Sequence, residues 1–177
     1  MLIADTSAWV EWLRQRESAA DLALDAAFAN DLVVLVEPVK AELLIGARDR
    51  AEVGILRRLL ETVDFELVCP RDDFESATEL FHTARQQGVT VRGVMDCLVA
   101  AMALRLQLPV LHHDQDFARM APVVAVRGDE VLFFREGRLL ASPLFGGGGG
   151  APREIPFSAR VEWPVPVRDE RPVLVPP

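Results

Sequence analysis

The first 126 residues alternate between short apolar runs and longer segments with helical periodicity. The run at 1–4 reads as a buried strand, and the β-branched "LVVLV" at 32–36 is typical of a parallel strand covered on both faces. Further short strands are predicted at 65–68, 109–112 and 123–126.

The segments between these strands carry helix signals. Thr6 or Ser7 can cap a helix that runs to about Arg16, and Pro38 suits the first turn of a helix that reaches about Arg48. The other predicted helices span 20–29, 50–63, 71–86 and 94–107, with a short one at "FARMA". Strands that alternate with helices predict an α/β fold, with a parallel sheet and helices on both faces.

The pattern changes after residue 130. The stretch "VLFFREGRLLAS" predicts a hairpin that turns at Glu136-Gly137, and five glycines from Gly146 mark a flexible break. Beyond them, frequent prolines and no helical period predict an extended segment. The chain is therefore divided into a domain at 1–130, a hairpin-like extension at 131–145 and a Gly/Pro-rich extended tail at 146–177.

Composition limits the classes of function. A length of 177 residues suits one sizeable core, and a net charge of −8 excludes a protein that grips nucleic acid by charge alone. No apolar run reaches the length of a membrane span, and "MLIADTSAWV" lacks the basic start of a secretory signal. Cys69 and Cys97 lie in apolar contexts, so a cytoplasmic protein with reduced core thiols is expected.

Acidic residues recur where strands end and helices begin. Asp5 follows the first strand, at the strand end where parallel sheets bind ligands, although it can also simply cap the next helix. Glu42 projects from an apolar helix stripe, where an unpaired carboxylate is costly; an outward-facing Glu is the plain alternative. Asp96 leads an apolar helix, where helix capping is again the alternative.

Two more acids follow the strand at 109–112. Asp116 directly precedes Phe117 and is the expected helix cap, whereas Asp114 is the preferred site residue. The topology brings Asp5, Glu42, Asp96 and Asp114 toward one edge of the sheet, where the four carboxylates repel unless a cation compensates. Hard oxygen ligands of this kind select Mg²⁺ or Mn²⁺.

Three segments give the chain a family resemblance. They are "LIADTSAWVEWL", "VKAELLIGARD" and "GVTVRGVMDCLVAAMALRLQLPVLHHDQDF", which contain the acids in order and at family-like spacing. From Met1 to about Val126 the sequence resembles PIN-domain proteins, and specifically VapC-type toxins of toxin–antitoxin pairs. The resemblance implies a three-layer α/β/α fold with a short central parallel sheet flanked by helices.

The resemblance also implies a metal-dependent endoribonuclease that a VapB-type antitoxin holds inactive and that forms a homodimer. The catalytic acids would be Asp5, Glu42, Asp96 and Asp114, and all four would bind Mg²⁺ with Asp116 as a supporting or alternate ligand. Thr6 or Ser7 would add a hydroxyl near the site. Arg92 would contact substrate phosphate or fix the cluster, with a surface loop arginine as the alternative. Four arginines would guide RNA or form a solvated helix face: Arg48, Arg50, Arg57 and Arg58.

Other readings stay open at this level. His112 and His113 invite a zinc site, although neighbours in a strand face opposite sides. A phosphoaspartate protein that uses Asp5 would want a nearby lysine, and the chain has only Lys40. A non-catalytic PIN-like binding module would be expected to have lost acids.

Two further segments have competing interpretations. Trp9 and Trp12 share a helix face, which favours core packing over a groove for the antitoxin. The tail is either a disordered extension or a segment that folds across the acidic cleft. In the second case its arginines would pair with the cluster and displace the metal: Arg153, Arg160, Arg168 and Arg171.

Overall fold

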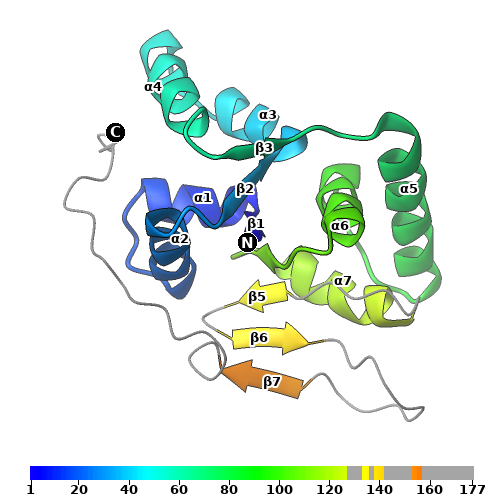
Figure 1. Ribbon diagram of the computed structural model, residues 1–177. Coiled ribbons are helices and arrows are strands. Elements are labelled where there is room, and N and C mark those ends of the chain that lie inside the picture. The colour runs from blue at the N-terminus through cyan, green and yellow to red at the C-terminus, as the bar shows by residue number, and fades with distance from the viewer. Residues whose placement is uncertain (127–132, 136–137, 142–152, 157–177) are drawn as a thin grey trace.

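One sheet organises the chain. The computed structural model describes residues 1–126, 133–135, 138–141 and 153–156, and its strands lie in the order β3-β2-β1-β4-β5-β6-β7 (Figure 1). The strands are β1 (Leu2–Ala4), β2 (Val33–Val36), β3 (Asp64–Glu66), β4 (Val110–Leu111), β5 (Phe133–Arg135), β6 (Arg138–Ala141) and β7 (Arg153–Pro156). From β3 to β5 every pair is parallel, and β6 and β7 are antiparallel to their neighbours.

Helices cover both faces of the parallel strands, as the alternating pattern predicted. They are α1 (Thr6–Leu13), α2 (Ala19–Ala29), α3 (Glu37–Ile45), α4 (Arg50–Leu60), α5 (Pro70–Gln86), α6 (Val94–Leu106) and α7 (Gln115–Val126). In Figure 1, α1 and α2 lie on one side of β1 and β2, and α5 and α6 lie on the other. The predicted three-layer α/β/α fold is confirmed.

The order of the strands fixes where a site can form. The chain passes from β1 outward to β2 and β3, and then crosses to β4 on the other side of β1. Ligands of open parallel sheets bind outside the carboxyl ends of the strands at such a reversal. Asp5 directly follows β1, and residues 112–116 follow β4, so the sequence places its acids at this point.

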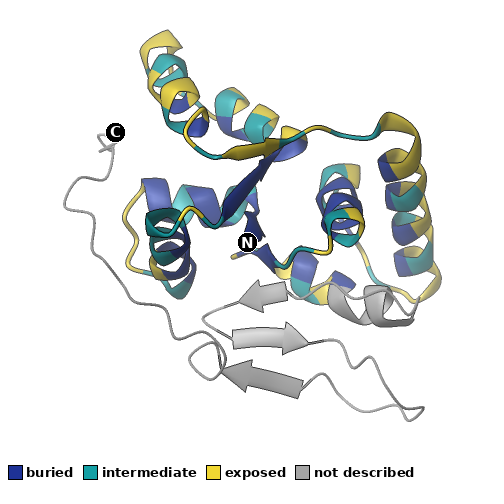
Figure 2. Ribbon diagram, in the orientation of Figure 1, coloured by how far each residue is buried: buried dark blue, intermediate teal, exposed yellow. Residues whose placement is uncertain are grey.

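The core lies between the sheet and the helices, where Figure 2 shows the buried residues. Strands β1, β2 and β4 are buried along their whole length, as expected of parallel strands covered on both faces. Trp9 and Trp12 are both buried, which confirms that these two side chains pack in the core. An antitoxin groove lined by them is not supported. Cys69 and Cys97 are free thiols, and Cys97 is buried.

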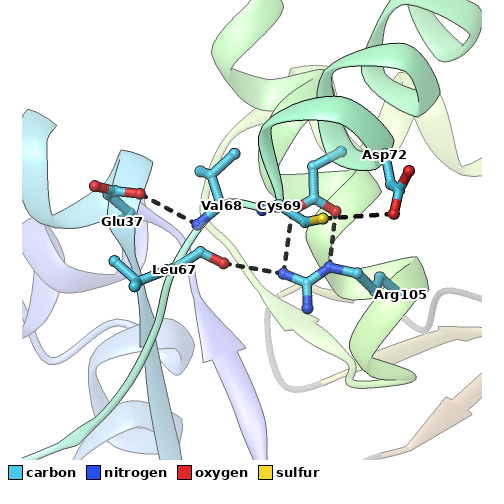
Figure 3. A network of polar contacts seen from close by, with 7 residues as sticks. Glu37, Leu67, Val68, Cys69, Asp72 and Arg105 are labelled. Atoms are coloured by element: carbon cyan, nitrogen blue, oxygen red, sulfur yellow. Dashed lines mark hydrogen bonds and ion pairs between the residues drawn. The ribbon is translucent and has the colours of Figure 1, made fainter.

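The connection between β3 and α5 is fastened to α6 by one arginine (Figure 3). Arg105 Nε donates to Asp73 Oδ1 at 2.8 Å, and Nη2 donates to Asp73 Oδ2 and to the Leu67 carbonyl, both at 3.1 Å. Glu37 accepts the Val68 N–H at 3.1 Å in the same network. The hydrogen bonds that Arg105 donates to the buried Asp73 carboxylate raise the pKa of Arg105, and they fix this side chain in a structural contact.

The strand predicted at 123–126 is wrong, because these residues continue α7. The β-branched "VVAV" and the preceding Pro122 both argue against a helix in isolation. Tertiary packing outweighs these local preferences: α7 starts at Gln115, buries Phe117 and Met120, and packs against α5 and β5. The predicted short helix "FARMA" is therefore one part of a longer one.

The predicted hairpin is confirmed in its two strands, since Arg135 pairs with Arg138 in an antiparallel register. Its turn residues lie outside the described part of the chain. Residues 153–156 of the tail form β7 against β6, which fits the predicted extended segment. The proposed contact of the tail with the acidic cleft named four arginines. Arg153 lies in β7, paired with Ala141 of β6, and Arg160, Arg168 and Arg171 are outside the described residues.

Two smaller expectations concern the surface. The arginines of the α3–α4 region are exposed, and Arg48 pairs with Glu52 at 3.2 Å, as a solvated helix face requires. Within the described ranges, no helix is both long and apolar enough to cross a membrane.

Candidate functional site

Asp5 both caps α1 and faces the strand ends. Its Oδ2 accepts the Ser7 N–H at 2.9 Å and the Ser7 hydroxyl at 2.6 Å. The Ser7 hydroxyl in turn accepts the His113 N–H at 2.8 Å, so the start of α1 is tied to the end of β4. Burial raises the pKa of Asp5, the Ser7 hydrogen bonds oppose that rise, and the charge of Glu42 adds to it. Asp5 therefore caps α1, as the plain alternative predicted, and it also lies near Glu42, another of the predicted site acids.

Glu42 reaches the same place from α3. The side chain is half-buried, and its Oε2 accepts a hydrogen bond from the Thr6 hydroxyl. The alternative of a solvated, outward-facing Glu is thus wrong. Thr6 and Ser7 each hold one acid of the site, which gives both hydroxyls a defined role in orienting carboxylates.

Asp96 tests whether the acids converge. Burial and the charges of four other carboxylates raise its pKa from 3.8 to about 7; in decreasing order, the four are Asp5, Asp116, Asp114 and Glu42. The α6 N-cap is Gly93, with no side-chain cap, so Asp96 does not cap this helix. The other four acids therefore lie near enough to Asp96 for their charges to act on it, whereas a shared metal site stays a prediction. Asp5, Glu42, Asp96, Asp114 and Asp116 are called the acidic cluster below.

Of the two acids after β4, Asp114 and not Asp116 caps α7. Asp114 Oδ1 accepts the Asp116 N–H at 2.9 Å and so caps the start of α7, which corrects the assignment of Asp116 as the cap. Asp116 is instead buried, with 1% of its surface exposed. Asp116 lies two residues further along the chain than Asp114, and its side chain points into the interior. Its charge raises the pKa of Asp96 more than that of Asp114 does.

Two arginines meet Asp116. Arg92 Nε lies 3.3 Å from Asp116 Oδ2, and Arg119 Nη1 lies 2.9 Å from Asp116 Oδ1. Arg92 therefore borders the cluster and is also an exposed loop arginine, so its contact with substrate phosphate stays a prediction. Arg119 was not singled out from sequence, although its place three residues after Asp116 on one helix face was the available signal.

The cluster fits a divalent cation in charge and donor chemistry. Its ligands would be hard carboxylate oxygens, and their mutual repulsion at Asp96 is the imbalance that Mg²⁺ or Mn²⁺ relieves. Among the described side chains, no three of His, Cys, Asp or Glu already stand in metal-binding geometry. Several oxygens are turned toward internal partners, such as Asp5 toward Ser7 and Glu42 toward Thr6, so binding requires side-chain rotation.

The two alternative sites, a zinc site and a phosphoaspartate site, lack the side chains that they would need. His112 is buried against Phe117, with ring centroids 5.2 Å apart, whereas His113 is exposed, so the pair does not form a zinc site. Lys40 Nζ lies 4.4 Å from the centroid of the Phe65 ring on β3, where it makes a cation–π contact. A phosphoaspartate reaction at Asp5 therefore lacks its lysine.

The family model for the PIN domain matches residues 2–122. The chain is 34% identical over 125 residues to VapC ribonuclease Mb1587 of Mycobacterium bovis and to ribonuclease VapC11 of Mycobacterium tuberculosis. Each match covers 70% of this chain and 93% of the relative.

Solved structures share the fold at lower identity. VapBC2 from Rickettsia felis, bound to a DNA fragment from its promoter, matches with a TM-score of 0.59 and 16% identity, and covers 76% of this chain and 97% of that one. FitAB bound to an IR36 DNA fragment matches with a TM-score of 0.57 and 18% identity, over 84% of this chain and 100% of that one.

Proposed function

The chain belongs to the PIN-domain family and to its VapC ribonucleases, and from this we propose that it is a metal-dependent endoribonuclease toxin of a toxin–antitoxin pair. The observation that carries the proposal is the convergence of five carboxylates on Asp96 and its neighbours. A binding module without catalysis has no need to hold so many like charges together.

The residues of the acidic cluster have distinct tasks in this reaction. Asp5, Glu42, Asp96 and Asp114 would hold Mg²⁺ or Mn²⁺, which supplies Lewis acidity and an activated water. Thr6 and Ser7 orient Glu42 and Asp5 through their hydroxyls. In the metal-free chain, burial and the neighbouring carboxylates raise the pKa of Asp96 to about 7, and a bound cation would favour its charged form.

The chain is further proposed to act in the cytoplasm as a homodimer and to bind a VapB-type antitoxin. The support for a partner is that matching solved structures are VapBC complexes, including a DNA-bound one from Salmonella typhimurium with a TM-score of 0.59. The proposed substrate is RNA, in keeping with the ribonuclease relatives.

RNA cleavage should depend on a divalent ion. We expect the purified chain to cut single-stranded RNA with Mg²⁺, to stop in excess EDTA and to recover when Mg²⁺ or Mn²⁺ is added back, because the cluster offers hard oxygen ligands. The measurement is electrophoresis of end-labelled RNA over time. Undiminished cleavage in EDTA would rule out the metal-dependent mechanism.

Substitution of Asp5 separates its two roles. Asp5→Asn should not lower folding stability, because Asn caps helices as well as Asp, yet it should lose cleavage by at least about a hundredfold. Asp5→Ala should lose the same activity and about 1 kcal/mol of stability.

Ser18→Ala is the matched control for the Asp5 variants. Ser18 caps α2 through the Asp21 N–H at 3.2 Å and is not a member of the acidic cluster. It should cost about 1 kcal/mol by loss of the cap and leave cleavage unchanged. Activity retained in Asp5→Asn would mean that Asp5 is a structural cap only.

A further inference from the structure

Two arginines share one buried carboxylate beside the acidic cluster. The Asp116 side chain is 2% exposed and is paired with Arg92 through one oxygen and with Arg119 through the other. One guanidinium suffices to neutralise one carboxylate, so the group of three carries a net charge of +1. The second arginine needs an explanation other than the burial of Asp116.

Most of the hydrogen-bonding capacity of these arginines faces solvent. The Arg92 side chain is 70% exposed and the Arg119 side chain is 46% exposed. Arg92 contacts Asp116 Oδ2 through its backbone N–H at 3.4 Å and through Nε at 3.3 Å, so both of its terminal nitrogens have no hydrogen-bond partner among the described residues. Arg119 Nη2 reaches only Gln115 Oε1, at 3.4 Å. The exposed donors form a fork of the kind that binds phosphate oxygens in pairs.

Arg105 shows how a purely structural arginine differs. It also pairs with a buried acid, Asp73, but it makes two short bonds to that carboxylate and a third to the Leu67 carbonyl (Figure 3). Its side chain is 32% exposed, less than half the value for Arg92. Arg105 therefore donates to internal partners, whereas Arg92 and Arg119 keep hydrogen-bond donors exposed to solvent.

Arg92 and Arg119 lie beside the acidic cluster, where the proposed reaction takes place. Asp116 follows Asp114 by two residues and donates its N–H to that acid, and its charge acts on Asp96 second only to that of Asp5. Arg105 lies nine residues beyond Asp96 on α6, or about 13 Å along the helix axis at 1.5 Å per residue.

We propose that Arg92 and Arg119 bind a backbone phosphate of the RNA strand next to the acidic cluster, and that Asp116 positions these arginines rather than binding metal. This inference rests on the proposed ribonuclease function and assigns the substrate contacts of its site. It also explains how an acidic protein holds a polyanion: the metal meets one phosphate, and the two guanidinium groups meet its neighbour.

Binding without cleavage tests the arginines. A fluorescent single-stranded RNA of about 12 nucleotides is titrated with the full chain in EDTA at several salt concentrations, and anisotropy gives Kd. Arg92→Gln with Arg119→Gln should raise Kd at least about tenfold. The slope of log Kd against log salt should fall by about 0.7, since the two arginines contact one phosphate and each phosphate contact on a single strand contributes about 0.7.

Arg105→Gln is the matched control, because it also removes a guanidinium from a buried acid. It should lower stability and leave the salt slope unchanged. The variant with Lys at both 92 and 119 guards against misfolding: it keeps the charge, so the slope should persist while Kd rises through loss of the planar fork. Far-UV circular dichroism checks that each variant is folded.

Three outcomes are distinguishable. Cleavage by the wild-type chain together with an unchanged slope in the double Gln variant would overturn this inference and leave the proposed function intact. A reduced slope without cleavage in Mg²⁺ would support the inference and overturn the proposed function. A wild-type chain that neither binds RNA in EDTA nor cleaves it in Mg²⁺ would overturn both.

Asp116→Asn tests the positioning role. If Asp116 orients the arginines, the variant should raise KM about tenfold with kcat little changed, and Mg²⁺ should shift the melting temperature as in the wild-type chain. A metal ligand would behave differently: the concentration of Mg²⁺ needed for half-maximal activity would rise at least about tenfold, and the thermal shift by Mg²⁺ would shrink. That result would return Asp116 to the metal site.

Discussion

Asp96→Asn should inactivate the enzyme and at the same time stabilise the metal-free protein at pH 8. The loss of activity, at least about a hundredfold, follows from removal of a carboxylate that the proposed metal needs. The gain in stability follows from the raised pKa of Asp96, which reflects first the cost of burying its negative charge and then the repulsion from four other carboxylates. One substitution therefore moves activity and stability in opposite directions.

The sign of the pH dependence is set by that pKa. Because the carboxyl has a pKa of about 7 in the folded chain and an ordinary value of 3.8, the folded chain binds the proton more tightly than the unfolded chain does. The contribution of Asp96 to the stability of the wild-type chain should therefore be highest below about pH 4 and fall as the pH rises through about 7. The full shift corresponds to about 4 kcal/mol, which solvent screening of this half-exposed group reduces to about 1–2 kcal/mol.

The measurement is urea unfolding in EDTA at pH 5 and pH 8. The difference in unfolding free energy between Asp96→Asn and the wild-type chain should grow with pH, and Mg²⁺ should narrow it by stabilising only the wild-type chain. Asp72→Asn is the matched control, because Asp72 is the third residue of α5 just as Asp96 is the third residue of α6. Equal stabilities at pH 8 would mean that the acids do not repel one another.

The convergence of the acids was open to prediction because it follows from topology. Asp5 ends a strand, Asp114 follows another, and parallel strands place their carboxyl ends along one edge. The apolar stripe around Glu42 added a second kind of signal, since a carboxylate in that position needs a partner. Thr6 supplies it from the first turn of α1.

What sequence could not decide was orientation within short segments. Asp114 and Asp116 are two residues apart in a strand-to-helix turn, and only the path of the backbone determines which one caps α7 and which is buried. The helix through Pro122 was missed for a related reason. Local preference at "VVAV" favours a strand, and only the packing of α7 against α5 and β5 reverses it.

Trp9→Ala should be among the most destabilising single changes in the chain, at about 3–5 kcal/mol. The Trp9 side chain is fully buried, and its ring meets Trp12 edge-on at 5.7 Å and Phe28 edge-on at 6.2 Å, while Trp12 and Phe28 stack at 5.2 Å. Removal of the ring leaves a cavity and ends two aromatic contacts, each worth about 0.5–1.5 kcal/mol. Such a loss is a large part of the roughly 5–15 kcal/mol that holds a domain together.

The position of Trp9 makes the effect reach the acidic cluster. Helix α1 has 8 residues, too few to be stable without tertiary packing, and the aromatic contacts with Phe28 fasten it to α2. Asp5 is the N-cap of the same helix, so a loosened α1 also loosens a cluster carboxylate.

Urea unfolding followed by circular dichroism gives the stability without interference from Trp163, which would complicate fluorescence. Leu22→Ala is the control: Leu22 is 58% exposed on α2, so this variant should change the free energy of unfolding by less than about 0.5 kcal/mol. A loss below 1 kcal/mol in Trp9→Ala would contradict the packing of α1 on α2.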